Sequence, residues 1–345
     1  MTKWDKEYIK LCKKILKEGK EVENRTGVNT IKIPSYHLHF DLREEFPVLA
    51  TKQLFFRQAI LEMLWIYQAQ SNDVRWLQER NVHIWDEWEI ADDGAWHATQ
   101  NVMENGKYVK KDIVKQFPEG FEHTIGTAYG YIVNKFQMTQ NLIKTIKENP
   151  TDRRMVMTLW QNDYLDTAVL PSCVWSSEWD VTDGYLNLWV HQRSCDVPLG
   201  LPFNVTQYAT LLSLIAQVTG LKPGTIDWSI KDAHIYVNQI DGVKEQIRRE
   251  DRYNELSLLP HDELIKMKKS LEDKLSLIKD IKSDEYKKLD TENRIIDLIL
   301  YPTHPHLELN KDIDDFFKFD NSKELKDVKI KSYKHMGKIT FPIAQ

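Results

Sequence analysis

Residues 192–211 read QRSCDVPLGLPFNVTQYATL, and part of this stretch belongs to the densest group of potentially reactive side chains in the chain, between Pro171 and Asn204. It places Arg193 next but one to Cys195, and it carries Asn204 in the group LGLPFN. The apolar run at 205–219 follows directly and predicts a buried helix. Strand-like runs lie before and after it, so the stretch sits within a mixed pattern of helices and strands.

Two cysteines of this region are candidate nucleophiles, Cys195 and Cys173 of the upstream group PSCVW. A cysteine attacks carbon only as the thiolate, so it needs a nearby cation to lower its pKa from about 8.5, and Arg193 is a candidate for that cation. The alternative for each is a small, inert core residue. With Cys12 the count is three, which indicates neither a disulfide framework nor a metal-binding spacing. We therefore expect no metal.

The composition is that of a folded, mildly acidic chain. Its 345 residues, 41% of them hydrophobic, suffice for one large domain or two smaller ones. A net charge of −5 lacks the basic field of a nucleic-acid binder, so nucleic acid is disfavoured as the main partner. The N-terminus has no apolar signal region, and no run approaches the ~20 residues of a membrane span. A cytoplasmic location without membrane contact is expected.

Hydrophobic patterns alternate between helical and strand spacing without the regularity of a βαβ fold, which predicts the α+β class. Helical spacing or unbroken apolar character predicts helices at 4–18, 53–70 and 205–219. Alternating patterns predict strands at 31–42 and 153–160, further strands within 173–193 with a turn at Asp183-Gly184, and a strand pair at 224–237. The polar stretch at 89–112 is interpreted as a loop or a small insertion.

The segment 252–302 differs in composition, because Lys, Asp and Glu dominate it. Apolar residues recur at steps of three and four on both sides of Ser283-Asp284, which can end one helix and cap the next. We therefore predict an antiparallel helical hairpin inserted into the main domain. It is either a solvated excursion or a contact for a partner or a second subunit.

Four arginines stand in unusual settings. Arg25 precedes a turn, Arg153 and Arg154 open an apolar strand, and Arg193 ends one. Guanidinium groups grip phosphate with two parallel hydrogen bonds, so several converging arginines would hold a nucleotide monophosphate. Each alone could equally serve a structural ion pair.

The stretch at 192–211 closely resembles the nucleotide-binding signature of the thymidylate synthases. Further motifs of that family follow its order along the chain: RTG at 25–27, LEMLWIY at 61–67, IWDEW at 84–88, AYG at 128–130, RR at 153–154 and DAHIY at 232–236. The resemblance implies an α+β fold in one catalytic domain over 1–345, with 252–302 inserted. It also implies a homodimer packed through a sheet, and reductive methylation of dUMP to dTMP.

The resemblance also implies roles in nucleotide binding. Cys173 matches the nucleophile that attacks C6 of dUMP, and Arg193 matches the arginine that contacts both this thiolate and the phosphate. Further phosphate ligands are implied at Arg25 and Ser194, with Arg153 and Arg154 donated by the opposite subunit. The ribose hydroxyl would be held by His234 and Tyr236.

Three more positions match the base and proton chemistry. Asn204 matches the reader of the uracil ring, because an amide offers a donor for O4 and an acceptor for N3–H, which favours dUMP over dCMP. Glu62 matches the glutamate that relays protons, and a carboxyl group on an apolar helix is costly to bury without such a role. Tyr129 matches the tyrosine of the network that removes the proton from C5.

The co-substrate implied is 5,10-methylenetetrahydrofolate. Asp196 matches the aspartate that binds the pterin ring, and Lys52 resembles a lysine near the glutamate tail of the folate, although it could equally be a solvated surface lysine. The small apolar residue near the C-terminus that helps close the site matches Ala344. The remaining walls of the folate pocket are implied at Trp85, Trp88, Leu199, Gly200 and Phe203.

Two departures keep alternatives open. Val174 follows the cysteine where many members of the family have histidine, which we interpret as a subfamily trait. The chain ends in Gln345, whose amide could hold a water in the closed site. Attack of water instead of hydride would give a hydroxymethyl product, so a dUMP or dCMP hydroxymethylase is the first alternative. A non-catalytic nucleotide- or RNA-binding protein on the same fold is the second.

Overall fold

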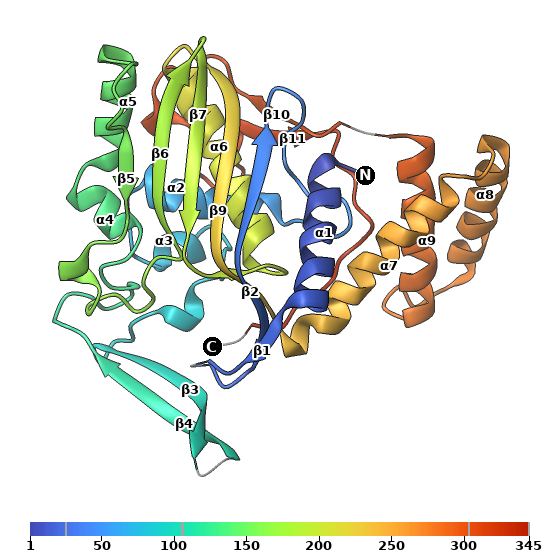
Figure 1. Ribbon diagram of the computed structural model, residues 1–345, viewed down its shortest axis with the longest axis horizontal. Helices are drawn as coiled ribbons and strands as arrows, with labels where there is room; N and C mark the ends of the chain where they lie inside the picture. The colour runs from blue at the N-terminus through green and yellow to red at the C-terminus, as the bar shows by residue number, and fades with distance from the viewer. Residues whose placement is uncertain (25, 105–106, 303, 344–345) are drawn as a thin grey trace.

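A seven-stranded sheet forms the centre of the molecule in a computed structural model that describes residues 1–24, 26–104, 107–302 and 304–343 (Figure 1). The strand order is β1-β2-β9-β7-β6-β5, with β8 beside β9, and only the β7–β9 and β8–β9 pairs among these are parallel. The bounds are β1 (Lys20–Val22), β2 (Thr30–Asp41), β5 (Val156–Thr158), β6 (Val174–Thr182), β7 (Tyr185–Gln192), β8 (Cys195–Asp196) and β9 (Lys222–Tyr236). The α+β prediction is confirmed.

Helices cover one face of this sheet. The central helix, α6, is buried along almost its whole length between the sheet and α2. Its buried residues are mostly apolar and lie on every side, as expected for a helix enclosed by protein. The bounds are α1 (Lys3–Glu18), α2 (Phe56–Tyr67), α3 (Arg75–Gln78), α4 (Gly130–Lys135), α5 (Met138–Glu148) and α6 (Gly200–Val218), with short turns η1 (Asp86–Trp88), η2 (Asn162–Tyr164), η3 (Val237–Gln239) and η4 (Phe316–Lys318).

The opposite face of the sheet exposes large aromatic side chains. Trp175 and Trp189 are 37% and 47% exposed, and the ring of Trp189 stacks on His191 with centroids 5.6 Å apart. The turn between β6 and β7 falls at Asp183-Gly184, where both residues have positive φ, and this confirms the predicted turn.

The polar stretch at 89–112, interpreted from the sequence as a loop or a small insertion, is not a loop. A long two-stranded ribbon, β3 (Ala95–Glu104) and β4 (Lys107–Gln116), projects from the body below the central sheet in the view of Figure 1. Its strands pair with each other alone, so neither face needs the apolar alternation by which strands are recognised in sequence. A second small ribbon pairs β10 (His306–Leu309) with β11 (Val328–Lys331).

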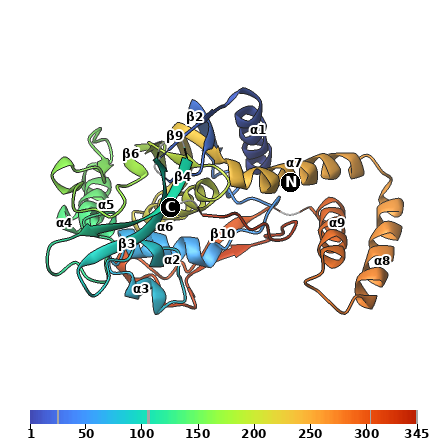
Figure 2. The ribbon, with the colours of Figure 1, turned by 90° about the horizontal axis from the view of Figure 1, so that it is seen from below.

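Three helices form an arm at the other side of the molecule, α7 (Ile240–Leu256), α8 (His261–Leu277) and α9 (Asp284–Leu300), with α8 outermost (Figure 2). Ser283 caps α9 by accepting a hydrogen bond from the Tyr286 N–H, as predicted. The helical pair begins later than residue 252, because residues 252–256 complete α7. A separate hydrophobic cluster, which includes Leu256, Leu264 and Ile295, joins the three helices.

Other predicted bounds also shifted. Residues 53 and 54 lie outside α2, which begins at Phe56, and their N–H groups bond to Gly337 O and the Tyr333 hydroxyl. The α6 helix begins five residues earlier than predicted. The predicted strand pair at 224–237 is one long strand, β9, because it pairs with β2 over nearly its whole length. Within the described ranges, no helix combines the length and apolar character needed to span a bilayer.

Candidate active site

Cys173 and Arg193 are brought together by the pairing of β6 with β7. Val174 lies opposite Gln192 in the register, so the residues just before β6 and just after β7 become neighbours, and the Arg193 N–H donates to Cys173 O at 2.9 Å. The Arg193 side chain donates to the carbonyls of Pro171 (2.6 Å) and Ser172 (3.0 Å). Its Nη2 thereby lies 4.0 Å from Cys173 Sγ, within reach of a thiolate.

The other two cysteines are shut away from solvent. Cys195 and Cys12 are completely buried, and none of the three cysteines, all within the described ranges, forms a disulfide. Burial raises the pKa of Cys12 to about 12 and that of Cys195 well above its ordinary value. Of the three cysteines, Cys173 therefore has the accessibility that a nucleophile needs.

Cys173 lies where two cavities meet. The outer cavity has a volume of about 720 Å³ and opens to solvent. Its lining mixes one wall of aromatic and aliphatic groups with polar groups from β8 and the end of β9. Among its lining residues are eight positions singled out in the sequence besides Cys173: Trp88, Arg193, Ser194, Asp196, Leu199, Gly200, His234 and Tyr236.

The inner cavity, about 160 Å³, lies behind Cys173 and is lined by Glu62, Trp85, Tyr129 and Asn204, among others. Glu62 accepts hydrogen bonds from Trp85 Nε1 at 2.8 Å and from Gln207 Nε2 at 2.5 Å. Burial raises the pKa of Glu62 to about 7 against the opposing effect of these two donors. A carboxyl group with that pKa can both take up and release protons near neutral pH.

Tyr129 connects the nucleophile to the inner cavity. Its hydroxyl accepts from the Cys173 N–H at 3.1 Å, and its ring packs edge-on against Trp85 with centroids 5.4 Å apart. The backbone of Tyr129 has φ of +45°, a conformation rare for a bulky residue and common at functional sites. Burial raises the pKa of Tyr129 well above its ordinary value, so the hydroxyl stays protonated.

The far wall of the outer cavity is fixed by β8 and β9. Asp196 accepts from Leu199 N–H and Gln239 Nε2, both at 3.0 Å, and burial raises the pKa of its carboxyl group despite these donors. His234 is buried and its Nδ1 lies 2.9 Å from Asp232 O, which leaves Nε2 as the atom available to a ligand. A strand bridge pairs Asp196 with His234.

Comparison with known proteins identifies the family of the chain. The thymidylate synthase family model matches residues 6–296. The chain belongs to the thymidylate synthase family.

Individual relatives agree with this assignment. The chain is 44% identical to the thymidylate synthase of Clostridium beijerinckii over 288 residues, which cover 83% of the chain and 96% of the relative. It is 36% identical to thymidylate synthase 1 of Bacillus spizizenii over 269 residues, 72% of the chain and 85% of the relative. The solved structure of thermostable thymidylate synthase A from Bacillus subtilis superposes with a TM-score of 0.71 at 30% identity, covering 100% of both chains.

Some positions matched to the thymidylate synthase pattern are not at the cavities. Arg153 and Arg154 are exposed, and Arg154 pairs with Asp152 at 2.9 Å. Phe203 packs at the edge of the core and is not among the described residues that line either cavity. Arg25 and Ala344 lie outside the described residues.

Lys52 is not the solvated surface lysine that the sequence allowed. It is 5% exposed, donates to Pro198 O, and lies 4.7 Å above the ring of Phe341. Burial lowers its pKa to about 8. The surface interpretation is therefore wrong, because the C-terminal segment folds over this side chain.

Several residues around the thymidylate synthase site were missed in the sequence. Trp160 lines the outer cavity, and the Arg193 guanidinium lies 5.3 Å from its ring centroid. Gln239 donates to both Asp196 and Pro342 O and so joins the site to the C-terminal segment. Gln207 is a polar residue on an apolar helix, and the argument applied to Glu62 would have found it.

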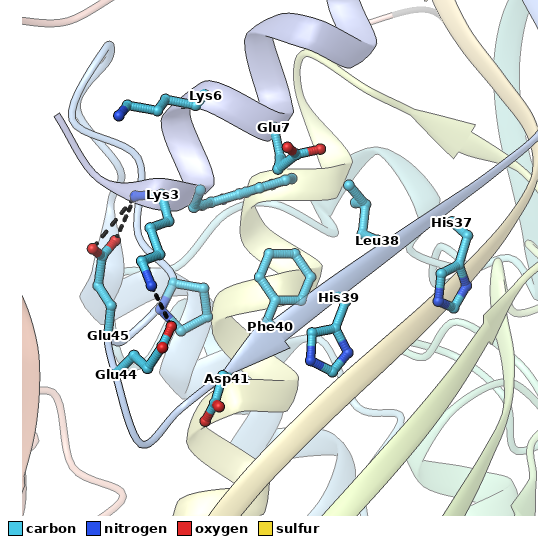
Figure 3. Close-up of a pocket in the computed structure, with 12 residues that line it drawn as sticks. Lys3, Lys6, Glu7, His37, Leu38, His39, Phe40, Asp41, Glu44 and Glu45 are labelled. Carbon is cyan, nitrogen blue, oxygen red and sulfur yellow. Dashed lines mark hydrogen bonds and ion pairs between the residues drawn. The ribbon is translucent and has the colours of Figure 1, made fainter.

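A second large cavity, of about 520 Å³, lies between the start of α1 and β2, away from Cys173 (Figure 3). Lys3 is held there by an ion pair to Glu44, and its backbone N–H bonds to Glu45 at 3.0 Å. The described lining contains no cysteine or arginine, and Lys3, one of its two lysines, is already paired with Glu44. The cavity therefore does not compete as the nucleotide site.

Proposed function

We propose that this chain catalyses the reductive methylation of dUMP to dTMP with 5,10-methylenetetrahydrofolate, which leaves as dihydrofolate. The observation that carries the proposal is the 4.0 Å separation of Cys173 Sγ and Arg193 Nη2 at the junction of the two cavities. A guanidinium at that distance stabilises a thiolate, and the thiolate can attack C6 of a uracil ring lying across the junction.

The nucleotide would lie along the polar wall of the outer cavity. Arg193 and Ser194 offer donors to the phosphate, while His234 and Tyr236 lie beside each other, with ring centroids 5.2 Å apart, for the ribose hydroxyl. Arg25 is assigned to the phosphate by its match to the family motif. A nucleotide bound in this way would have its base toward Cys173.

The inner cavity supplies base recognition and proton transfer. Asn204 would present its Nδ2 to O4 and its Oδ1 to N3–H of uracil. Bond formation between Cys173 Sγ and C6 makes C5 nucleophilic, and Glu62 can protonate or deprotonate groups near O4, directly or through water, because its pKa is about 7. Tyr129, held protonated and bonded to the Cys173 backbone, is placed to orient a water that accepts the C5 proton.

The remaining walls of the outer cavity suit the folate. Trp88, Leu199 and Ile343 give apolar surface for a flat ring, and Gly200 gives close approach, while Asp196 can bind the ring nitrogens. Methylenetetrahydrofolate supplies both the one-carbon group and the hydride. The chain contributes by holding the ring against the nucleotide and excluding water, which favours the methyl over the hydroxymethyl product.

We further propose a homodimer that packs through the open face of the sheet. Exposed tryptophans on a flat sheet face are unusual for a protein that remains a monomer, and Trp175, Trp189 and His191 form one contiguous aromatic group there. The exposure of Arg153 and Arg154 is consistent with their donation to a second subunit.

The test uses purified protein with dUMP and methylenetetrahydrofolate. We expect absorbance in the dihydrofolate band to rise, and mass spectrometry to detect dTMP. Formation of 5-hydroxymethyl-dUMP without dihydrofolate would instead assign the hydroxymethylase. A protein that forms no covalent adduct with 5-fluoro-dUMP and the folate would be a binding protein, and the proposal would be wrong.

A further inference from the structure

Gln207 lies on α6 inside the inner cavity, 4% exposed, between the base-reading Asn204 and the carboxyl group of Glu62. Nothing in the sequence motifs gives it a role. A buried amide needs partners for two donor hydrogens and one acceptor oxygen, and the identity of these partners determines how its neighbours are presented.

The orientation of the Gln207 amide is fixed by a backbone group. Its Nε2 donates to Ala59 O at 3.1 Å, and a carbonyl oxygen can only accept. The second hydrogen of Nε2 is donated to Glu62 Oε2 at 2.5 Å. The Oε1 atom must then face Asn204, and it accepts from Asn204 Nδ2 at 3.2 Å.

The other side of Asn204 is fixed in the same way by Gln192. The Gln192 Oε1 accepts from the indole N–H of Trp228 at 3.0 Å, and the Gln192 Nε2 donates to Ser194 O, also at 3.0 Å. Because an indole only donates and a carbonyl only accepts, the Gln192 amide cannot be reversed. Its Nε2 therefore points to Asn204 Oδ1, at 3.3 Å.

We propose that Gln207 is a positioning residue that sets the donor–acceptor sense of the Asn204 amide and at the same time holds the Glu62 carboxylate. The inference rests on the proposed function. A reversed Asn204 amide would set donor against donor at N3 of uracil and acceptor against acceptor at O4, which is the pattern that a cytosine ring satisfies better. One side chain thus couples base choice to proton transfer.

The electrostatic environment of Glu62 supports this coupling. The titratable groups that share the inner cavity with it are Tyr67 on α2, Tyr129 before α4, Cys173 before β6 and Tyr208 on α6. The hydrogen bonds that lower the pKa of Glu62 come from Trp85 and Gln207. Loss of the Gln207 bond should therefore move the Glu62 ionisation to higher pH.

The experiment compares Gln207→Met, similar in length but without hydrogen bonds, with Gln217→Met. Gln217 lies on the same helix and also donates to two carbonyls, those of Asn310 and Ile313, away from the site. For Gln207→Met we expect the Glu62 ionisation in the kcat–pH profile to rise by about one unit. The ratio of kcat/KM for dUMP over dCMP should fall about ten-fold, as for one lost hydrogen bond. Gln217→Met should keep the wild-type pH of the Glu62 ionisation and the wild-type ratio of kcat/KM for dUMP over dCMP.

Should Gln207→Met fail to fold, Gln207→Glu keeps the shape of the side chain. A second carboxyl group facing Glu62 should raise the same ionisation further. An active wild type whose folded Gln207 variant keeps both the pH profile and the base selectivity would overturn this inference alone. A wild type that makes no dTMP would overturn the proposed function, and this inference with it.

Discussion

The buried guanidinium of Arg249 donates to the carbonyl of Gly337 at 3.1 Å and to that of Thr51 at 2.8 Å. It joins α7 to the C-terminal segment and to the loop before α2. Met336 N–H adds a bond to Ala50 O at 2.7 Å, and Lys334 pairs with Asp297 of α9 at the same distance. The C-terminal segment places Phe341 over Lys52 and Ile343 at the outer cavity. The bonds from the helical arm therefore hold this segment in place.

Replacement of Arg249 by Met should loosen this segment. It would leave two buried carbonyls without their donor, for an expected loss of about 2–4 kcal/mol in the free energy of unfolding. Because the segment reaches the folate wall, KM for the folate should rise more than KM for dUMP. Arg248, half exposed and paired with the same Glu245, is the matched control, and Arg248→Met should cost less than about 0.5 kcal/mol. Equal losses of the free energy of unfolding in urea for the two variants would contradict the role of Arg249 in holding this segment.

The choice of nucleophile predicts different results for two cysteines. Cys173→Ser should fold normally and lose turnover by several orders of magnitude, because a neutral hydroxyl is a poor nucleophile toward C6. Cys195→Ala should stay active, since that thiol is buried with a raised pKa. The measurement is kcat together with adduct formation with 5-fluoro-dUMP. An inactive, folded Cys195 variant beside an active Cys173 variant would reverse the choice.

The proposed dimer predicts complementation between two inactive chains. Arg154→Ala and Cys173→Ala proteins, mixed under conditions in which subunits exchange, should regain part of the dTMP-forming activity, because one hybrid site recovers both groups. The Asp152→Asn variant is a control for the local ion pair, since Asp152 is the acid that binds Arg154 within its own chain. A mixture with demonstrated exchange and no recovered activity would place Arg154 outside the partner's site.

His335 predicts a loss of stability in acid. Burial, followed by the neighbouring Arg294, lowers the pKa of its ring to about 4, and the ring accepts a hydrogen bond from Gly337 N–H at 3.1 Å, which a protonated Nδ1 could not do. As the pH falls from about 6.5 toward 4, His335 is protonated in the unfolded chain before it is protonated in the folded chain. The free energy of unfolding therefore falls by roughly 1–3 kcal/mol. His335→Gln should show a smaller loss when urea unfolding at pH 7 and pH 4.5 is compared. An identical loss in both proteins would exclude His335 as its source.

The sequence predicted the elements that leave a local pattern, either apolar residues at a regular spacing or residues typical of turns and caps. The α1 helix, β2, the Asp183-Gly184 turn and the Ser283 cap were found because each depends on a local pattern of apolar, turn or capping residues. The β3–β4 ribbon was missed, since strands that pair only with each other leave no such pattern. The motif resemblance named Cys173, Arg193, Glu62 and Asn204, and the structure gathers all four around one junction.

Tertiary structure alone decided which side chains share an environment. From the sequence, Cys173 and Cys195 were both candidate partners of Arg193, and only strand pairing separates an accessible thiol from a buried one. Lys52 could be exposed or buried until the C-terminal segment was seen to cover it. The sense of the Asn204 amide depends on carbonyls and an indole far apart in the chain, at Ala59, Ser194 and Trp228. Local sequence determines which helices, strands, turns and caps can form. The hydrogen-bond partners of a side chain and its dielectric environment are set by contacts between distant segments, and those contacts exist only in the folded chain.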